Sequence, residues 1–415
     1  MPARTVRTSA MKGQGSEMSL VCDLCFSRQR CWFGAERAMA TKNDTKKKGK
    51  GKGGKAARAD KKPKSSAAKT EPKKAEPKKP EPKLQNVSFW IGFDLGGTKM
   101  MATVLDADYK VLGSARKATN GTEGPAKGKA RIVKLIQEAM RSAHVAPKGL
   151  QGIGIGCPGL VNPEKGVLIN APNLGWSHVG LKSLLGNSFK VPVAVINDVD
   201  AGTYGEYAIG AGKGARSLLG VFPGTGLGAG YVYNGELIQG RTISALELGM
   251  MYLPGTHIGS AQRGAVLLED LGSRLGLAAH GGVACYRGQA EALNKKTGGN
   301  LRDVKSKALA RSLREGDEGT MVMFGNSVRY LGLGVAMVVT LLAPDRIVLG
   351  GGLVEELPSL YVNLLKEEVA RYALPELAKP IKYTVAKLGD NAVTAGAVAW
   401  LRHTTESAKS KGEKA

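Results

Sequence analysis

The 415-residue sequence has few aromatic residues and few cysteines. Phe, Trp and Tyr make up 5% of it, whereas glycine occurs 57 times, a combination typical of an α/β protein with many tight turns. The five cysteines are an odd number, and Cys157 and Cys285 stand far from the others. We therefore expect no disulfide framework, and we expect a reducing, cytoplasmic setting. No uninterrupted run of about 18 apolar residues is present, so we expect no membrane span.

Several catalytic and metal-binding patterns are also missing. The absence of GxSxG argues against a serine-hydrolase elbow, and the absence of GxxxxGK[S/T] argues against a P-loop. No paired CxxC motifs suggest a zinc ribbon, and His178, His257 and His280 show no HxxxH spacing. The spacing of potential ligands therefore predicts no zinc site.

Positive charge, by contrast, is abundant and unevenly distributed. The net charge is +25, and between Ala40 and Lys83 alone 17 Lys and Arg stand against 5 Asp and Glu, a net charge of +12. Low hydrophobicity with high like charge predicts disorder, and the repeated Glu-Pro-Lys-Lys units favour an extended polyproline conformation. This tail either makes weak contacts with nucleic acid or polyphosphate, or is a solubilising extension.

Residues 1–38 differ from the tail, because they contain Cys22, Cys25 and Cys31. One interpretation is a small metal knuckle, although a fourth ligand at suitable spacing is missing. The other is that translation starts at Met39, so that residues 1–38 are not made.

Order is expected to begin at Phe89 and to continue as strand and helix alternation. Two halves each open with a strand, a glycine turn and a strand, which indicates a duplicated α/β plan with a ligand crevice between the halves. We expect a disordered extension (1–85), two α/β domains (86–210 and 211–403) and a disordered end (404–415). The expected strands are 89–95, 101–106, 110–113, 152–156, 191–197, 218–222, 228–233, 346–350 and 381–385, and the expected helices are 125–144, 199–209, 320–342, 356–372 and 391–402.

A candidate phosphate loop follows the first strand, in Asp94-Leu-Gly-Gly-Thr-Lys99. Gly96 and Gly97 allow backbone N–H groups to approach an anion closely, and Thr98 and Lys99 can add donors. Asp94, at the end of the strand, is placed to hold Mg²⁺ or its water ligands. The alternative is an ordinary hairpin turn.

A second candidate loop contains Gly224, Thr225 and Gly226, again between two apolar strands. Its GxGxxG-like spacing is followed by a strand rather than a helix, which argues against a dinucleotide site. Gly350, Gly351 and Gly352 follow a buried strand and could let an adenine lie against the backbone, or form a tight strand–helix turn. Two phosphate hairpins in one chain are much rarer than either one alone.

Asn197 ends the strand 191–197 and Asp198 directly follows it, where a general base would face the crevice. Such a base accepts the proton of a hydroxyl that attacks a γ-phosphate. Asp200 is the competing candidate, although we expect it to cap or begin the next helix. Glu247 and Glu269 are candidate acceptors for sugar hydroxyls, with solvated helix-face carboxylates as the alternative.

The sequence from about 89 to 403 resembles the ROK family (repressors, open reading frames and kinases), especially its glucokinases. The resemblance implies an actin/hexokinase-like ATPase fold, a homodimer, and phosphorylation of hexoses by ATP with Mg²⁺. It also implies Asp198 as the catalytic base and Asn197, Glu247, Glu269 and Asn173 as sugar-binding residues. The matching segments are AspLeuGlyGlyThrLys (94–99), GlyIleGlyCysProGlyLeuVal (154–161), AlaProAsnLeuGlyTrp (171–176), AsnAspValAspAlaGly (197–202), GlyThrGlyLeuGlyAlaGly (224–230) and IleValLeuGlyGlyGly (347–352).

Two departures from the family pattern point to a zinc-free member. Met250 stands where the family has a histidine after Glu-x-Gly, and the family's cysteine-rich zinc segment is replaced by residues 256–269 without cysteine. Methionine donates no hydrogen bond, so sugar affinity or specificity is expected to change. An inactive relative is the alternative, against which the retention of Asp198 and both loops argues.

The sequence therefore predicts a cytoplasmic glucokinase of glycolysis. One alternative keeps the kinase but uses polyphosphate as donor, or mannose, fructose or an N-acetylhexosamine as acceptor. Another is a non-catalytic, sugar-sensing regulator that binds DNA. The Lys- and Pro-rich N-terminal region shows no helical period, which argues against the helix-turn-helix of the family's repressors.

Overall fold

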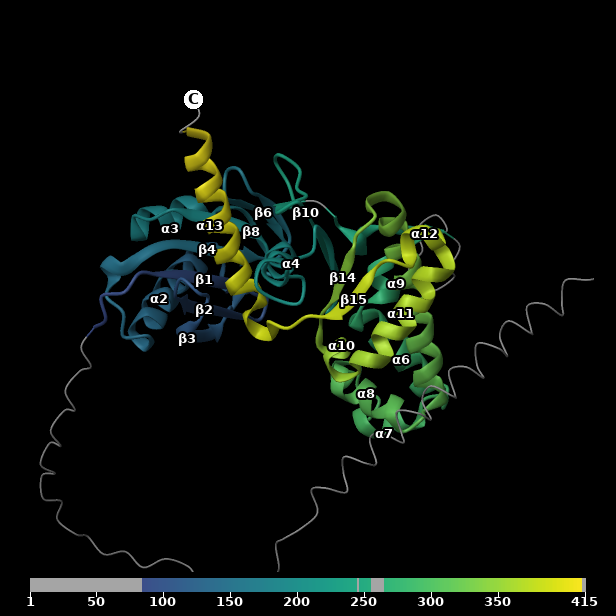
Figure 1. Ribbon diagram of the computed structural model, residues 1–415. Helices are drawn as coiled ribbons and strands as arrows, with labels where there is room; N and C mark the ends of the chain where they lie inside the picture. The colour runs from purple at the N-terminus through teal and green to yellow at the C-terminus, as the bar shows by residue number, and fades with distance from the viewer. Residues whose placement is uncertain (1–83, 245, 255–264, 413–415) are drawn as a thin grey trace, which may run out of the picture. The chain divides into compact units, whose positions relative to one another are not determined.

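The computed structural model describes residues 84–244, 246–254 and 265–412 (Figure 1). The expectations for the basic tail, for the cysteines before residue 84, for Met39 and for His257 lie outside these residues. The strands and helices expected from Phe89 onward can be compared with the structure.

The first sheet has five strands in the order β3-β2-β1-β4-β8. β1, β2 and β3 form an antiparallel meander, whereas β4 runs parallel to β1, and β8 parallel to β4. β1, β2 and β4 are almost continuously buried, as expected for strands that are covered on both faces. The bounds are β1 (Phe89–Leu95), β2 (Lys99–Leu105), β3 (Val111–Ala118), β4 (Leu150–Cys157) and β8 (Val193–Asn197).

Helices α2 (Pro125–Ser142) and α13 (Ala392–Gly412) cover opposite faces of this sheet. Successive residues of a strand point to opposite faces. Ile91 and Phe93 share an apolar core with α2, whereas a Cβ on Gly92 would lie 2.2 Å from the carbonyl oxygen of Thr394 in α13. The absence of a side chain at Gly92 therefore lets α13 lie directly on β1.

α13 differs from expectation in its packing and in its length. It follows the second sheet in sequence but packs against β1, β4 and helix α4 of the first, although the expected division assigned it to the second domain. The predicted disorder of 404–412 was wrong, because the helix continues to Gly412. The Thr405 hydroxyl donates to the carbonyl of Leu401 (2.7 Å), and Ala, Glu and Lys in this stretch favour helix.

A small antiparallel sheet and two short helices complete the region around the first sheet. The small sheet has the order β5-β6-β7, and none of its strands was predicted. Its bounds are β5 (Leu160–Asn162), β6 (Val167–Ala171) and β7 (Trp176–Gly180), and the helices are α3 (Leu181–Phe189) and α4 (Asp198–Ala208).

The second sheet repeats the plan of the first in the order β11-β10-β9-β14-β15. β9 and β10 form an antiparallel hairpin, and β14 and β15 add parallel strands, as β4 and β8 do in the first sheet. The bounds are β9 (Ser217–Pro223), β10 (Leu227–Tyr233), β11 (Glu236–Leu237), β14 (Arg346–Leu349) and β15 (Lys382–Val385), with a separate pair β12 (Tyr252–Pro254) and β13 (Ala265–Leu267).

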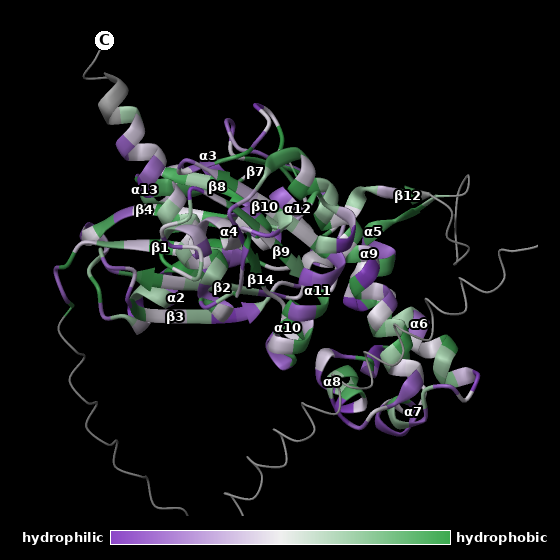
Figure 2. Ribbon diagram, turned by 45° about the vertical axis from the view of Figure 1, so that its right-hand side comes forward, coloured by the Kyte–Doolittle hydropathy of each residue, from purple (hydrophilic) through white to green (hydrophobic). Residues whose placement is uncertain are grey.

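The helices beside the second sheet carry both hydrophobic and hydrophilic residues, as α11 shows in Figure 2. α9 alone is long and apolar enough, among the described residues, to cross a membrane by length and composition. It packs against α5, α6 and α11, and 61% of its most apolar stretch is buried, so it is a core helix. The bounds are α5 (Leu268–Gly272), α6 (Arg274–Tyr286), α7 (Glu291–Thr297), α8 (Ser306–Arg314), α9 (Glu318–Leu342), α10 (Gly352–Glu356), α11 (Pro358–Tyr372) and α12 (Pro375–Ala378).

Candidate functional site

The first candidate loop is the turn between β1 and β2, residues 96–98, which we call the first turn. The Thr119 hydroxyl donates to the carbonyl of Gly96 (2.6 Å), and the Thr119 N–H donates to the carbonyl of Thr98 (2.9 Å). Thr98 and Lys99 are exposed. A Cβ on Gly97 would lie 3.3 Å from the Cβ of Asn173, so the structure brings this predicted sugar-binding residue against the turn.

Asp94 lies on β1 just before the first turn, between Met101 of β2 and Gly156 of β4 in the strand register. The pKa of Asp94 is raised to about 7, chiefly by burial and then by the negative charge of Asp198, while the positive charge of Arg116 opposes both. Two carboxylates that lie close together in a partly desolvated place repel each other, and a bound cation would relieve this repulsion. The pair fits Mg²⁺, which keeps several water ligands and takes only one or two carboxylates from a protein.

Asp198 is the first residue of α4, and Asn197 is the residue that caps this helix. The Asn197 side-chain oxygen accepts the N–H groups of Val199 (2.8 Å) and Asp200 (3.2 Å), and its amide donates to the carbonyl of Gly159 (3.0 Å). The expectation that Asp200 caps or begins the helix was wrong, because α4 begins at Asp198, one residue earlier than expected, and Asn197 caps it. The cap fixes the backbone from which the Asp198 carboxylate projects.

The Asp198 carboxylate accepts the N–H of Val199 (2.9 Å), at the positive end of the helix dipole. Burial raises the pKa of Asp198 in spite of this hydrogen bond. A carboxylate with a raised pKa is a better proton acceptor near neutral pH than an ordinary aspartate. Burial raises the pKa of Cys157, at the end of β4, and the negative charges of Asp198 and Asp94 raise it further. The ends of β1, β4 and β8 therefore meet at one place.

Asp200 belongs to α4, is 1% exposed, and its side chain lies against β10. The Gln239 amide donates to it (3.2 Å), and a Cβ on Gly230 of β10 would lie 3.3 Å from its other oxygen. Burial raises the pKa of Asp200 to about 7, with smaller contributions from the charges of Glu247 and Asp198. Asp200 is thus enclosed by its neighbours, which separates it from the more accessible Asp198.

Glu247 lies directly before the short 3₁₀ turn Leu248–Met250, so it is not on the face of a longer helix. Partial desolvation raises the pKa of Glu247, and the charges of Asp198 and Glu269 raise it further. The structure therefore brings Glu247 near both of these predicted residues. Met250 ends the turn and is 45% exposed.

The second candidate loop is the turn between β9 and β10, residues 224–226, which we call the second turn. Glu269 of α5 accepts the N–H of Leu227 (2.7 Å), and a Cβ on Gly226 would lie 2.4 Å from the same carboxylate oxygen. Glu269 is therefore an anchor of the second turn rather than a freely solvated carboxylate. The charge of Glu269 also helps to raise the pKa of Glu247, so the two carboxylates lie near each other.

The first residues of α6 and the predicted adenine loop also hold the second turn. The Arg274 N–H donates to the carbonyl of Gly224 (3.0 Å), and its guanidinium donates to the Thr225 hydroxyl (2.9 Å). Gly351 has φ +105°, and a Cβ there would lie 2.8 Å from the carbonyl oxygen of Pro223. Only glycine adopts this backbone without strain. The structure thus brings Gly350, Gly351 and Gly352 together with Gly224, Thr225 and Gly226.

A cavity of about 570 Å³ opens beside the second turn. Gly352 lines it, together with Ser306, whose hydroxyl would lie 3.0 Å from a Cβ on Gly352. Its wall carries four cations beside the carboxylates of Glu355 and Glu356, an excess of positive charge that suits an anionic ligand such as a nucleotide. Sequence reasoning missed these cations, which belong to no motif and meet only in the folded chain: Arg274, Arg302, Lys305 and Lys307.

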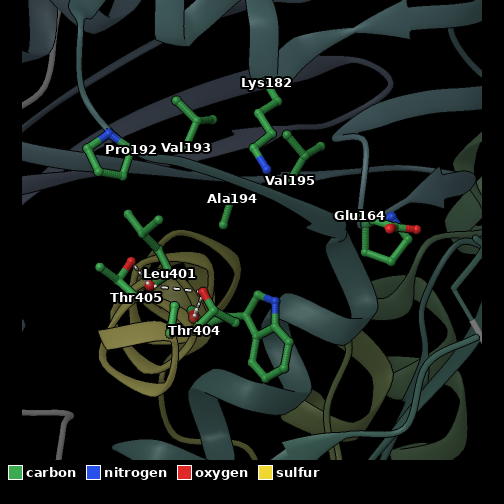
Figure 3. A pocket seen from close by; sticks show the side chains of 12 residues that line it. Glu164, Lys182, Pro192, Val193, Ala194, Val195, Leu401, Thr404 and Thr405 are labelled. Atoms are coloured by element: carbon green, nitrogen blue, oxygen red, sulfur yellow. Dashed lines mark hydrogen bonds between the residues drawn. The ribbon is translucent and has the colours of Figure 1, made fainter. Parts of the chain in front are cut away.

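A second cavity, of about 660 Å³, contains none of the predicted site residues. It lies at the open edge of β8, where Pro192 to Val195 face Leu401 and Thr404 of α13 (Figure 3), and Trp400 also lines it. Among the residues that the structure describes, no group of three or more His, Cys, Asp and Glu side chains could hold a metal ion.

Comparisons with known proteins agree with this arrangement. A glucokinase of Halalkalibacterium halodurans is 31% identical over 331 residues, which span 78% of this chain and 98% of that protein. A xylose repressor of Caldicellulosiruptor bescii is 27% identical over 265 residues, 64% of this chain and 66% of the repressor. The crystal structure of a ROK family glucokinase from Streptomyces griseus in complex with glucose and AMPPNP has a TM-score of 0.63 and 28% identity, and the match covers 76% of this chain and 100% of that one.

The ROK family model matches residues 90–404, nearly all of the region in which the two sheets and their turns lie. The resemblance found in the sequence is confirmed, and with it the expected actin/hexokinase-like ATPase fold. The relatives include both kinases and repressors, and the glucokinases support a sugar kinase. The chain belongs to the ROK family.

Proposed function

We propose that this protein is an ATP-dependent hexose kinase and that glucose is its first substrate. The observation that carries the proposal is the meeting of Asp94 and Asp198 at the ends of β1 and β8, each with a raised pKa. The glucokinase relatives and the AMPPNP complex of the Streptomyces griseus glucokinase support ATP as the donor.

In the proposed reaction a hexose hydroxyl oxygen forms a bond to the γ-phosphorus of ATP, and the bond to the bridging oxygen breaks. The hydroxyl proton passes to Asp198, and ADP leaves. Mg²⁺, held through Asp94, would neutralise charge on the phosphate oxygens. The N–H groups of the two turns would orient the phosphates, and the cavity beside Gly352 would hold the adenosine.

Asn197, Asn173, Glu247 and Glu269 are the proposed contacts of the sugar. The two glutamates accept hydrogen bonds from hydroxyl groups, and Asn197 holds Asp198 at the correct place. Met250 supplies no donor, which is the proposed reason for a sugar preference different from that of relatives with histidine.

ADP release with MgATP and glucose tests the proposal, with Asp198→Asn beside the wild type. Loss of the base is expected to lower kcat by about 100-fold or more and to leave nucleotide affinity unchanged. Equal turnover by the variant would remove Asp198 from the mechanism. Turnover with polyphosphate, mannose, fructose or an N-acetylhexosamine in place of ATP or glucose would assign the protein to one of those kinase classes.

A sugar-sensing regulator is the second candidate, and the xylose repressor among the relatives is the observation that favours it. Sugar binding without any phosphoryl transfer would support it. We further propose a cytoplasmic homodimer, which sedimentation velocity tests. Contact of the basic tail with nucleic acid or polyphosphate predicts binding that weakens steeply with added salt.

A further inference from the structure

The chain passes between the two sheets at two places. The first passage, residues 209–216, leads from α4 to β9, and the second passage, residues 386–391, leads from β15 to α13. α4 and α13 pack against each other beside the first sheet. Any change in the orientation of one sheet relative to the other must be accommodated in these two passages.

One buried side chain binds both passages. Glu206, near the end of α4, is 0% exposed. One of its oxygens accepts the N–H of Ala211 in the first passage (2.7 Å). The other accepts the N–H groups of Lys387 and Leu388 in the second passage, both at 2.8 Å. The charge of the carboxylate is thus compensated by three backbone donors from two separate segments.

The surroundings of Glu206 allow little alternative arrangement. A Cβ on Gly210 would lie 2.2 Å from the Glu206 carboxylate, and the Glu206 carbonyl accepts the N–H of Gly212 (2.8 Å). Earlier in α4, at Ala201, α4 and α13 cross without intervening side chains, because a Cβ on Gly396 would lie 1.8 Å from the carbonyl oxygen of Ala201. The helices and both passages therefore meet around this carboxylate.

Glu206 is also rigidly connected to the proposed base. Asp198 begins the helix that contains Glu206, and eight residues of α-helix span about 12 Å. We propose that Glu206 is a positioning residue that joins the two passages and thereby sets how Asp198 approaches the second turn. The link to phosphoryl transfer rests on the proposed kinase function, whereas the joining of the passages does not.

The test uses Glu206→Gln in the full chain, with Asp317→Asn as the matched control. A glutamine accepts hydrogen bonds through one oxygen only, and its amide nitrogen would face a backbone N–H. Asp317 is also a buried carboxylate that accepts two backbone N–H groups, from Ala292 (2.6 Å) and Thr320 (2.8 Å), but both lie among the helices beside the second sheet.

Hydrogen exchange of the ligand-free protein is measured first, because it requires no activity. In Glu206→Gln the amides of Ala211, Lys387 and Leu388 are expected to exchange about tenfold faster or more, and to do so together. Asp317→Asn is expected to leave them unchanged. Unaltered exchange in Glu206→Gln would overturn the proposal. If that variant does not fold, the three wild-type amides must still open with one common dependence on denaturant, and independent opening would overturn it.

Turnover and nucleotide binding are measured second. In Glu206→Gln kcat is expected to fall about tenfold, because a misplaced catalytic group slows transfer. The affinity for AMPPNP alone should change less than about twofold, since the cavity beside Gly352 is built from the second sheet and its helices. An equal loss of kcat in Asp317→Asn would reduce Glu206 to a general stabiliser. If the wild type has no turnover, the kinase proposal fails while the exchange result stands.

Discussion

The first and second turns occupy the same place in two sheets of the same plan, but they are built differently. The first turn is flanked by the ionisable residues Asp94 and Lys99, and Thr98 and Lys99 are exposed. It is closed by Thr119, which directly follows β3 of its own sheet. The second turn also has no charged residue of its own, but its flanking residues Pro223 and Leu227 are uncharged, and three other elements hold it through Glu269, Arg274 and Gly351.

The two turns therefore differ in what they contribute: the first has ionisable neighbours that can take part in the proposed reaction, and the second has backbone groups held in fixed positions. The first turn is held by Thr119, close to its own sheet, so the charge of a flanking residue such as Asp94 can be removed while the turn keeps its shape. A turn held by hydrogen bonds from two elements and by close packing against a third contributes backbone groups in fixed positions, so a change there disturbs packing first. Substitutions beside the first turn should therefore affect turnover most, and substitutions in the second turn should affect the free energy of unfolding most.

Asp94→Asn should produce the largest effect on turnover. The variant keeps the shape of the side chain and removes the charge proposed to hold Mg²⁺, so kcat is expected to fall about 100-fold. Folding stability at pH 8 should not fall, because burial holds the pKa of Asp94 at about 7 and the ionised group is the costly one. Steady-state kinetics and urea unfolding at pH 8 check both statements. Turnover within threefold of the wild type would exclude Asp94 from the reaction.

Much of this contrast could be predicted from the sequence. β1, β9 and β10 and both turns lie where their apolar runs and glycines predict them. The charged residues next to strand ends, Asp94 and Asp198, could be named because strand ends lie at one edge of a sheet. Such features depend only on residues close together in the chain.

The support of the second turn could not be predicted in the same way. Glu269 and Arg274 reach it from 42 and 49 residues away in the chain, and no local pattern records such a contact. The four cations that line the neighbouring cavity and the packing of α13 on the first sheet could not be predicted for the same reason, because each brings together residues that lie far apart in the chain. Asp200 was placed wrongly because Asn197, rather than a later residue, caps α4, and the contact of the Asn197 amide with the carbonyl of Gly159, 38 residues away in the chain, appears only in the folded protein.

Asp200→Asn should alter the pH dependence of stability, because Asp200 lies between the proposed base and the hairpin of the second turn. Burial holds its folded pKa at about 7, whereas an unfolded aspartate has a pKa of about 4. The stability that Asp200 contributes is therefore fully present below pH 4 and is lost as the pH rises toward 7. The loss between pH 5 and pH 8 is about 2–3 kcal/mol, and the variant should lack it.

Urea unfolding of both proteins from pH 5 to pH 8 measures this effect. The difference in unfolding free energy should grow with pH in favour of Asp200→Asn. A difference that is constant across this range would mean that Asp200 is already ionised in the folded protein at pH 5.

The smallest effect comes from a matched pair of glycine substitutions, one in each turn. A Cβ in Gly226→Ala would meet the Glu269 carboxylate at 2.4 Å and displace it from the Leu227 N–H, at a cost of about 1–3 kcal/mol for a donor left without a partner. In Gly97→Ala the nearest atom is the Asn173 Cβ at 3.3 Å, on an exposed turn that can move, so less than about 1 kcal/mol is expected. Thermal and urea unfolding compare the two variants. Equal destabilisation would mean that the first turn is held as firmly as the second, and that its charge, rather than its freedom from other elements, distinguishes it.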